Sequence, residues 1–436
     1  MFDFVSLPLF AGIILIIASA IAYCCLKRYE FAIFLIVISP LITEILTPNN
    51  GAGIGEDQAG IGSYIRVSIV LFIGCIGFIH FIKSRKLSGE RLPSHFYFLA
   101  LFLFLSLLST SYSLDPKYTA IRSLSFIAFY FFLLGLNYFL DREQNFSVTL
   151  NTCFSAIVLC LILNALSIII FPDRAWMAET EHRFQGLFSQ PNSLGAFCMV
   201  SYPVLLWKYW QYTSRHRYII MCLIITSFSL HFLSGSRTSL FASVFGIVIW
   251  LVLLKKKRQL IIFSAAAFCL VLILIGYEYV PSVLKRTESS NLTHLTGRTE
   301  IWKSAVILAS EKPIFGYGYS VDGKIFEDAR FYDEGLGLWS GSSRASLHNG
   351  YLSVFIGIGS IGLIIFCISL FLPLWKSFRV SSSVYKAFVV TIITMALVEN
   401  CTETFIVGGS SIESVVLWIA WVIAGKMTKT DSVFPS

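Results

Sequence analysis

Apolar stretches of about 20 residues, separated by short polar linkers, recur along the chain. A stretch of this length can cross a bilayer as a helix, which satisfies its own backbone hydrogen bonds in lipid. Because the second stretch is short and residues 218–254 also fit one re-entrant pair, twelve spans fit as well as thirteen. The pattern predicts an all-α polytopic membrane protein with about twelve, or thirteen, transmembrane helices. The thirteen candidate spans are 6–26, 31–47, 64–82, 95–112, 119–140, 150–171, 192–210, 218–234, 238–254, 260–279, 349–374, 386–404 and 411–425.

One long polar stretch of 68 residues, 280–347, interrupts this pattern. After Arg298, apolar residues recur at helical spacing until Pro313, which ends a helix, and the Gly-rich turn IFGYGYS follows. The stretch predicts a small cap made of an amphipathic helix and a loop. The chain therefore divides into a membrane bundle (1–279), the cap (280–347) and C-terminal membrane helices (348–436).

Composition supports a membrane protein. Hydrophobic residues make up 56% of the chain, charged residues make up 13%, and the mean hydropathy is +0.75. Soluble domains carry about 25% charged residues. So few charges cannot cover a water-facing surface of this size, which excludes a large soluble enzyme.

The net charge of +8 is explained by topology. If the basic linkers face the cytoplasm, that side holds 19 of the 33 Lys and Arg residues and 5 acidic residues, as the positive-inside rule requires. The clearest inner anchor is the run Lys255–Arg258. The positive charge is therefore a topology signal, and no nucleic-acid partner is expected.

Several charged or polar residues lie at the opposite, outer ends of the predicted spans. A guanidinium group matches phosphate oxygens with a planar fork of donors, and an imidazole can accept a proton from an attacking hydroxyl. Together these groups would suit the binding of a lipid-carried diphosphate and the activation of an acceptor hydroxyl. No metal-ligand spacing is found. The candidates are Arg183, Arg237, Arg298, His348, Asn349, Glu399 and Glu403.

Each candidate also has a structural interpretation. Arg183 could extend toward lipid headgroups, and His348 could be an interfacial or helix-capping residue. Arg237 lies between two apolar runs, where a charge is costly without a partner. Glu399 and Glu403, spaced i and i+4 on one predicted helix face, could simply neutralise the arginines.

Five short stretches together resemble the superfamily of O-antigen ligases and O-antigen polymerases, which are bacterial membrane glycosyltransferases. They are RFQGLFSQPNSLG (183–195), SGSRTSLF (234–241), GRTEIWKSA (297–305), KPIFGYGYS (312–320) and HNGYL (348–352). Their order and spacing agree with the family over roughly the C-terminal 250 residues. Before about residue 180 only the hydropathy pattern agrees.

The resemblance implies a GT-C-type helical bundle with a periplasmic cap in the bacterial inner membrane. It implies an inverting, metal-independent transfer of a glycan from undecaprenyl diphosphate, without a cofactor. The acceptor would be a lipid A-core sugar, another lipid-linked glycan or a protein side chain. By the matched motifs, His348 would be the catalytic base and Arg183 and Arg237 would bind the donor diphosphate. The remaining candidates (Arg298, Asn349, Glu399 and Glu403) would have supporting roles.

Three alternatives stay open at this stage. Ligases and polymerases share these motifs, so the sequence does not distinguish them. A transporter or flippase of lipid-linked oligosaccharides would place its charges near the bilayer midplane. An inactive scaffold would leave the clustered arginines and histidine unexplained. The number of spans is a separate question. A thirteenth span would place the N-terminus outside, whereas ligases of the family usually keep both ends inside.

Overall fold

The computed structural model describes a helical protein. The described residues are 19–46, 61–88, 91–141, 144–177, 183–212, 215–259, 261–262, 298–325, 347–380, 384–407 and 411–427. Within them there is no sheet, only one isolated bridge between Trp176 and Phe184. The helices are α2 (Tyr29–Leu46), α3 (Ile61–Ser88), α4 (Ser94–Leu108), α5 (Pro116–Phe139), α6 (Gln144–Ile170), α7 (Pro172–Ala175), α8 (Pro191–Gln211), α9 (Arg215–Ser234), α10 (Arg237–Leu253), α12 (Arg298–Glu311), α13 (Asp322–Ile325), α14 (Gly350–Phe378), α15 (Val384–Glu399) and α16 (Ile412–Lys426).

The helices confirm a polytopic membrane protein. Among the described residues, seven helices are long and apolar enough to cross a bilayer: α2, α3, α5, α6, α9, α14 and the run formed by α4 with the short turn after it. Residues 218–254 form two helices, α9 and α10, that meet at a tight turn. The predicted spans 6–26 and 260–279 lie mostly outside the described residues, so the total of twelve or thirteen stays a prediction.

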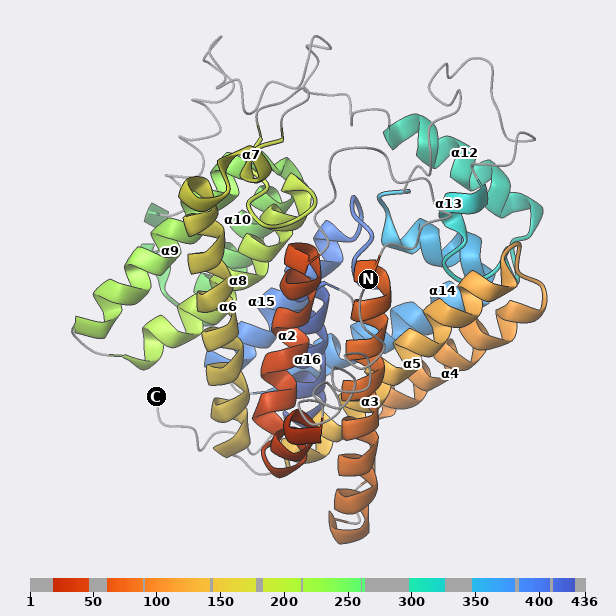
Figure 1. Ribbon diagram of the computed structural model, residues 1–436, viewed down its shortest axis with the longest axis horizontal. Coiled ribbons are helices and arrows are strands. Elements are labelled where there is room, and N and C mark those ends of the chain that lie inside the picture. The colour runs from red at the N-terminus through yellow and green to blue at the C-terminus, as the bar shows by residue number, and fades with distance from the viewer. Residues whose placement is uncertain are drawn as a thin grey trace, which may run out of the picture.

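The helix α16, of 15 residues, lies at the centre of the bundle (Figure 1). Every residue from Ile412 to Ala424 is buried, and the helix contacts α2, α5, α8, α14 and α15. A helix that is apolar on all sides belongs in such an interior position. Its Trp421 indole donates to the carbonyl of Ser369 at 2.7 Å, which ties α16 to α14.

The helix α14 is broken at Gly359, where φ is 71° and ψ is −170°. The Gly-rich turn after α12 fills this break: the backbone N–H groups of Tyr317 and Gly318 donate to the carbonyls of Ile356 and Gly357, both at 2.8 Å. A Cβ added to Gly359 would lie 2.0 Å from the carbonyl oxygen of Ile314 in this turn. The cap is therefore fixed to the bundle by backbone hydrogen bonds.

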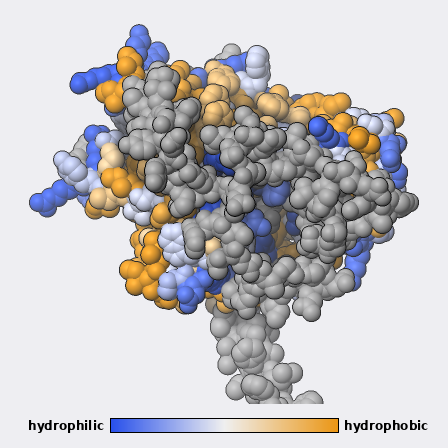
Figure 2. Space-filling model, turned by 90° about the horizontal axis from the view of Figure 1, so that it is seen from above, coloured by the Kyte–Doolittle hydropathy of each residue, from blue (hydrophilic) through white to orange (hydrophobic). Residues whose placement is uncertain are grey.

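The cap helix α12 lies where the sequence predicts a helix and ends before Pro313. Its apolar face, which includes Ala305 and Leu308, packs on buried residues of the turn after it and of α14. The Trp302 indole donates to the carbonyl of Leu347 at 2.8 Å. Seen from the side that carries α7 and α12, the molecule shows hydrophobic side chains along much of its edge, with hydrophilic ones among them (Figure 2). We call this side the outer face.

Candidate functional site

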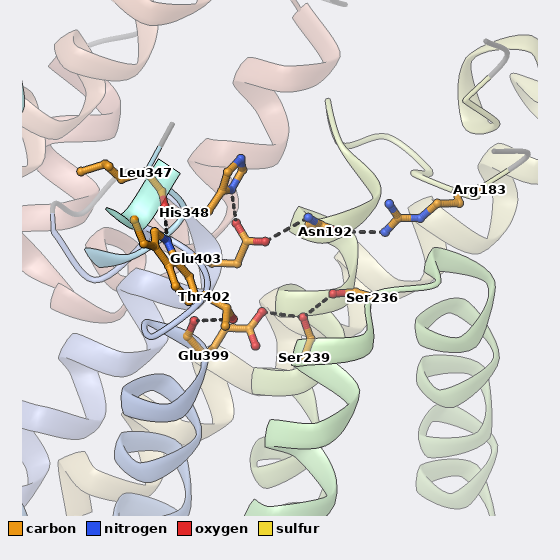
Figure 3. Close-up of polar contacts among 10 residues, drawn as sticks. Arg183, Asn192, Ser236, Ser239, Leu347, His348, Glu399, Thr402 and Glu403 are labelled. Carbon is orange, nitrogen blue, oxygen red and sulfur yellow. Dashed lines mark hydrogen bonds and ion pairs between the residues drawn. The ribbon is translucent and has the colours of Figure 1, made fainter. Parts of the chain in front are cut away.

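The site lies at the outer face, where three helices begin. The first turn of α8 contacts the turn before α10, since a Cβ on Gly195 would lie 2.4 Å from the Cβ of Ser236. The loop after α15 joins the start of α8 to the start of α14. Its Glu403 carboxylate contacts Asn192 in α8 and His348 just before α14 (Figure 3). Segments far apart in the chain therefore meet at one place.

His348 and Glu403 form a pair. The imidazole Nδ1 lies 3.0 Å from Oε2 of the carboxylate, and the two side chains are 31% and 15% exposed. His348 has φ +44°, a left-handed conformation that non-glycine residues rarely adopt, and such residues are concentrated at functional sites. The imidazole is thus partly open to the outside, and its Nδ1 is held by an acid.

The backbone beside His348 is fixed to the loop after α15. The Gly350 N–H donates to the carbonyls of Asn400 at 2.9 Å and of Glu403 at 3.2 Å. The side chain of Asn349 caps α14, since its Oδ1 accepts from the N–H groups of Tyr351 and Leu352. Asn349 therefore fixes the start of the helix that follows the imidazole.

Asn192 bridges Arg183 and Glu403. Its Oδ1 accepts from Nη2 of Arg183 at 2.7 Å, and its Nδ2 donates to Oε1 of Glu403 at 2.9 Å. The result is a continuous chain of hydrogen bonds from Arg183 to His348 (Figure 3). Sequence reasoning identified Asn192 only as part of a helix start, because nothing local indicates which acid it meets 211 residues later.

Arg183 is only 5% exposed, and its Nε donates to the carbonyl of Ser234 at 2.8 Å. A side chain that extends into the headgroup region would leave its guanidinium exposed. The interpretation of Arg183 as a headgroup contact is therefore wrong in this structure. The guanidinium instead lies buried between the start of α8 and the end of α9.

The two glutamates have different surroundings. Glu399 is the last residue of α15 and is fully buried. Its Oε1 accepts from the Ser239 hydroxyl at 2.7 Å. The Ser239 hydroxyl in turn lies 2.7 Å from the hydroxyl of Ser236. Glu403 lies in the turn beyond the helix, so the prediction of one shared helix face is wrong. The chain leaves the helix after Glu399, where the Thr402 hydroxyl takes the Glu399 carbonyl as its acceptor.

The two glutamates were expected to neutralise the arginines, and their hydrogen bonds show which groups they contact. Glu403 reaches Arg183 through Asn192 and directly contacts His348, while Glu399 contacts Ser239. The first turn of α10 thus supplies a hydroxyl partner, Ser239, for a buried acid, a role that the sequence pattern did not indicate.

Two further candidates lie at helix starts. Arg237 is the first residue of α10 and is partly exposed. Arg298 is the first residue of α12, as predicted, but its side chain lies outside the described residues. Among the residues that the structure describes, no group of three or more His, Cys, Asp or Glu is arranged to hold a metal ion.

The starts of α8 and α10 are suited to an anion, while the carboxylates of Glu399 and Glu403 lie near them and partly offset their positive charge. Each helix start carries a partial positive charge from N–H groups without intrahelical partners. At α8 and α10, the N-cap residues Gln190 and Ser236 make no side-chain capping hydrogen bond to these N–H groups. With Arg183 and Arg237 beside them, the two helix starts form a positive region that is suited to a phosphate ligand.

Comparison with known proteins agrees with the sequence resemblance. Residues 222–367, about a third of the chain, match the family model described as O-antigen ligase. This range includes Arg237, Arg298 and His348 and ends in α14. No curated protein matches the chain. The resemblance is confirmed over residues 222–367, where the chain is similar to the O-antigen ligase family.

Proposed function

We propose that the protein is an inner-membrane glycosyltransferase that transfers a glycan from undecaprenyl diphosphate to an acceptor hydroxyl on the periplasmic side. The observation that carries this proposal is the hydrogen-bond chain that joins a partly exposed histidine to a buried arginine beside two helix starts. One end of this chain suits a base and the other suits a diphosphate. The family match supports the same class of reaction.

The donor diphosphate would bind between the starts of α8 and α10. Arg183 and Arg237 would pair with its oxygens, because guanidinium groups stay charged and donate in a planar fork. The N–H groups at the two helix starts would add donors that need no reorganisation. Negative charge on the departing undecaprenyl diphosphate would thus be stabilised where it develops.

His348 would act as the base. With Nδ1–H donated to Glu403, the Nε2 atom carries a lone pair that can accept the proton of the acceptor hydroxyl. The acceptor oxygen then forms a bond to the anomeric carbon, while the bond from that carbon to the phosphate oxygen breaks on the opposite face. The bonding electrons leave with undecaprenyl diphosphate, and the anomeric configuration inverts. This chemistry needs no metal ion.

The transporter alternative is less well supported. Transporters of this kind use broken helices whose exposed backbone groups bind the cargo near the bilayer midplane. The break in α14 is occupied by the turn after α12, whose backbone pairs with Ile356 and Gly357. The charged groups collect instead at the helix starts, beside the cap.

A genetic experiment tests the proposal. In a deletion strain, surface and lipid-linked glycans would be separated on gels after complementation with the wild type or with His348→Ala. We expect wild type alone to restore transfer, and membrane extracts to contain equal amounts of both proteins. Long polymer left on the carrier lipid indicates a ligase, and single repeats without a ladder indicate a polymerase. Full transfer by His348→Ala would remove this histidine from the mechanism, and glycan retained in the cytoplasmic leaflet would favour a transporter.

A further inference from the structure

We propose that Asn192 is a positioning residue that joins the two halves of the site: it holds the Glu403 carboxylate toward His348 and the Arg183 guanidinium toward the donor. The inference rests on the proposed function, and it assigns a role to a residue outside the matched 222–367 segment. Asn192 would not touch the reacting atoms. It would act through its neighbours.

The chemistry of the two neighbours restricts what can stand between them. Arg183 offers only N–H donors, and an ionised Glu403 offers only acceptors. A bridging side chain must therefore accept on one side and donate on the other, as an amide does. The distances of 2.7 and 2.9 Å assign Oδ1 of Asn192 to Arg183 and Nδ2 to Glu403. An aspartate of the same shape would lack the donor.

An amide bridge also keeps the two charged groups apart. If Arg183 paired with Glu403 directly, the carboxylate would be drawn from His348 and the guanidinium from the donor phosphates. With Asn192 between them, Glu403 keeps Oε2 on Nδ1 of His348 at 3.0 Å. The bridge thus links a cation and an anion through a neutral group.

The backbone around Asn192 is rigid, as a positioning residue requires. Asn192 is the second residue of α8, after Pro191, whose ring presets the backbone angle of a first helical turn. Three residues on, Gly195 packs against Ser236 so closely that no Cβ fits. The amide is therefore held by two neighbouring helices, α8 and α10.

Two variants separate this role from a general loss of structure. Asn192→Asp keeps the shape and the contact to Arg183 but places a second carboxylate against Glu403. Asn192→Ala removes both contacts. Ser155→Ala, at an exposed position of α6 where the hydroxyl donates to the carbonyl of Asn151, is the control. We expect both Asn192 variants to lower glycan transfer on the order of 10- to 100-fold, since small misplacements of reacting groups have effects of this size. Ser155→Ala should match the wild type.

A second readout reports on the imidazole without turnover. Diethyl pyrocarbonate acylates neutral imidazole, and peptide mass spectrometry of the purified full chain in detergent can follow the modification of His348 against pH. The extra carboxylate in Asn192→Asp stabilises the imidazolium form. Its modification midpoint should therefore rise, by on the order of one pH unit. The midpoint in Ser155→Ala should stay where it is in the wild type.

The outcomes distinguish this inference from the proposed function. Transfer by His348→Ala would refute the base itself. If His348→Ala is inactive but both Asn192 variants transfer glycan like the wild type, the positioning role is wrong. Loss of transfer in Asn192→Asp with an unmoved His348 midpoint would also overturn it, because Asn192 would then serve the donor alone. Loss of transfer together with the raised midpoint supports it.

Discussion

The carboxylate of Glu403 lies 3.0 Å from Nδ1 of His348, although 55 residues separate the two in the chain. The contact is possible because the loop after α15 folds back onto the start of α14, where the Gly350 N–H donates to the carbonyls of Asn400 and Glu403. The same backbone contacts that begin α14 therefore place the acid behind the imidazole. Four predictions follow from this arrangement and from the way the cap is attached.

Replacing Glu403 with Gln should lower the transfer rate. The carboxylate can only accept from Nδ1–H of His348, which leaves Nε2 with the lone pair that a base needs. An amide can also donate to Nδ1 and so favour the other tautomer. We expect the transfer rate to fall by about 100-fold, with equal amounts of both proteins in the membrane. Wild-type transfer by Glu403→Gln would show that Glu403 does not act through His348.

Gly359→Ala should detach the turn after α12 from the break in α14. The residue has φ 71°, and an added Cβ would lie 2.0 Å from the carbonyl oxygen of Ile314. Strain of this kind costs about 1–3 kcal/mol, and the backbone contact adds to it. We expect a lower thermal unfolding temperature of the purified protein in detergent. Ser360→Ala is the control, because it keeps the N–H of residue 360 that donates to Pro313, and equal stability of both variants would contradict the prediction.

An ion pair between Asp115, before α5, and Lys324 in α13 should make the cap sensitive to acid. Burial alone would raise the pKa of the Asp115 carboxyl, but hydrogen bonds from Lys324 and the Tyr118 N–H outweigh it and hold the pKa below its usual value. The pKa of Asp115 is thus lower in the folded protein than in the unfolded chain, where it is about 4. Its charge therefore stabilises the folded protein above about pH 4, and this stabilisation is lost as pH falls through the folded pKa.

Asp115→Asn isolates that charge, since Asn also caps helices well and can still accept from Tyr118. At pH 7 the variant should unfold at a slightly lower temperature than the wild type. The difference should shrink as pH falls from about 4 through the lower folded pKa, because Asp115 is protonated in both states only below the folded value. It is small, since both side chains are partly exposed and solvent screens the pair. A constant difference across this range would mean that the charge contributes nothing.

The sequence predicted much of this fold because hydropathy is a local signal. The starts of α8 and α12, the stop before Pro313 and the re-entry after His348 all follow from composition and from proline positions within a few residues. Contacts between distant segments follow no such local rule. The Gly-rich turn was predicted, but its place in the break of α14 was not, since nothing near residue 359 indicates which backbone will pair there.

The site was predictable by residue type and only partly by partner. Arginines and a histidine at outer helix ends indicated the chemistry, and the family match supports it. Glu403 was assigned to a helix face and to charge neutralisation because the i, i+4 spacing is all that the sequence offers. Its contacts with His348 and Asn192 depend on the chain leaving α15 at Glu399, which tertiary packing decides.

The two arginines should respond differently to lysine. Arg183 donates from Nε to Ser234 and from Nη2 to Asn192, two directions that one ammonium on a flexible stem cannot reproduce. Arg237 is partly exposed at the start of α10, where a lysine keeps the positive charge beside the helix start. We therefore expect Arg183→Lys to lose most transfer and Arg237→Lys to keep a larger share, at least several-fold more. Binding of undecaprenyl diphosphate to the purified variants checks this, and equal losses would show that charge alone matters at both positions.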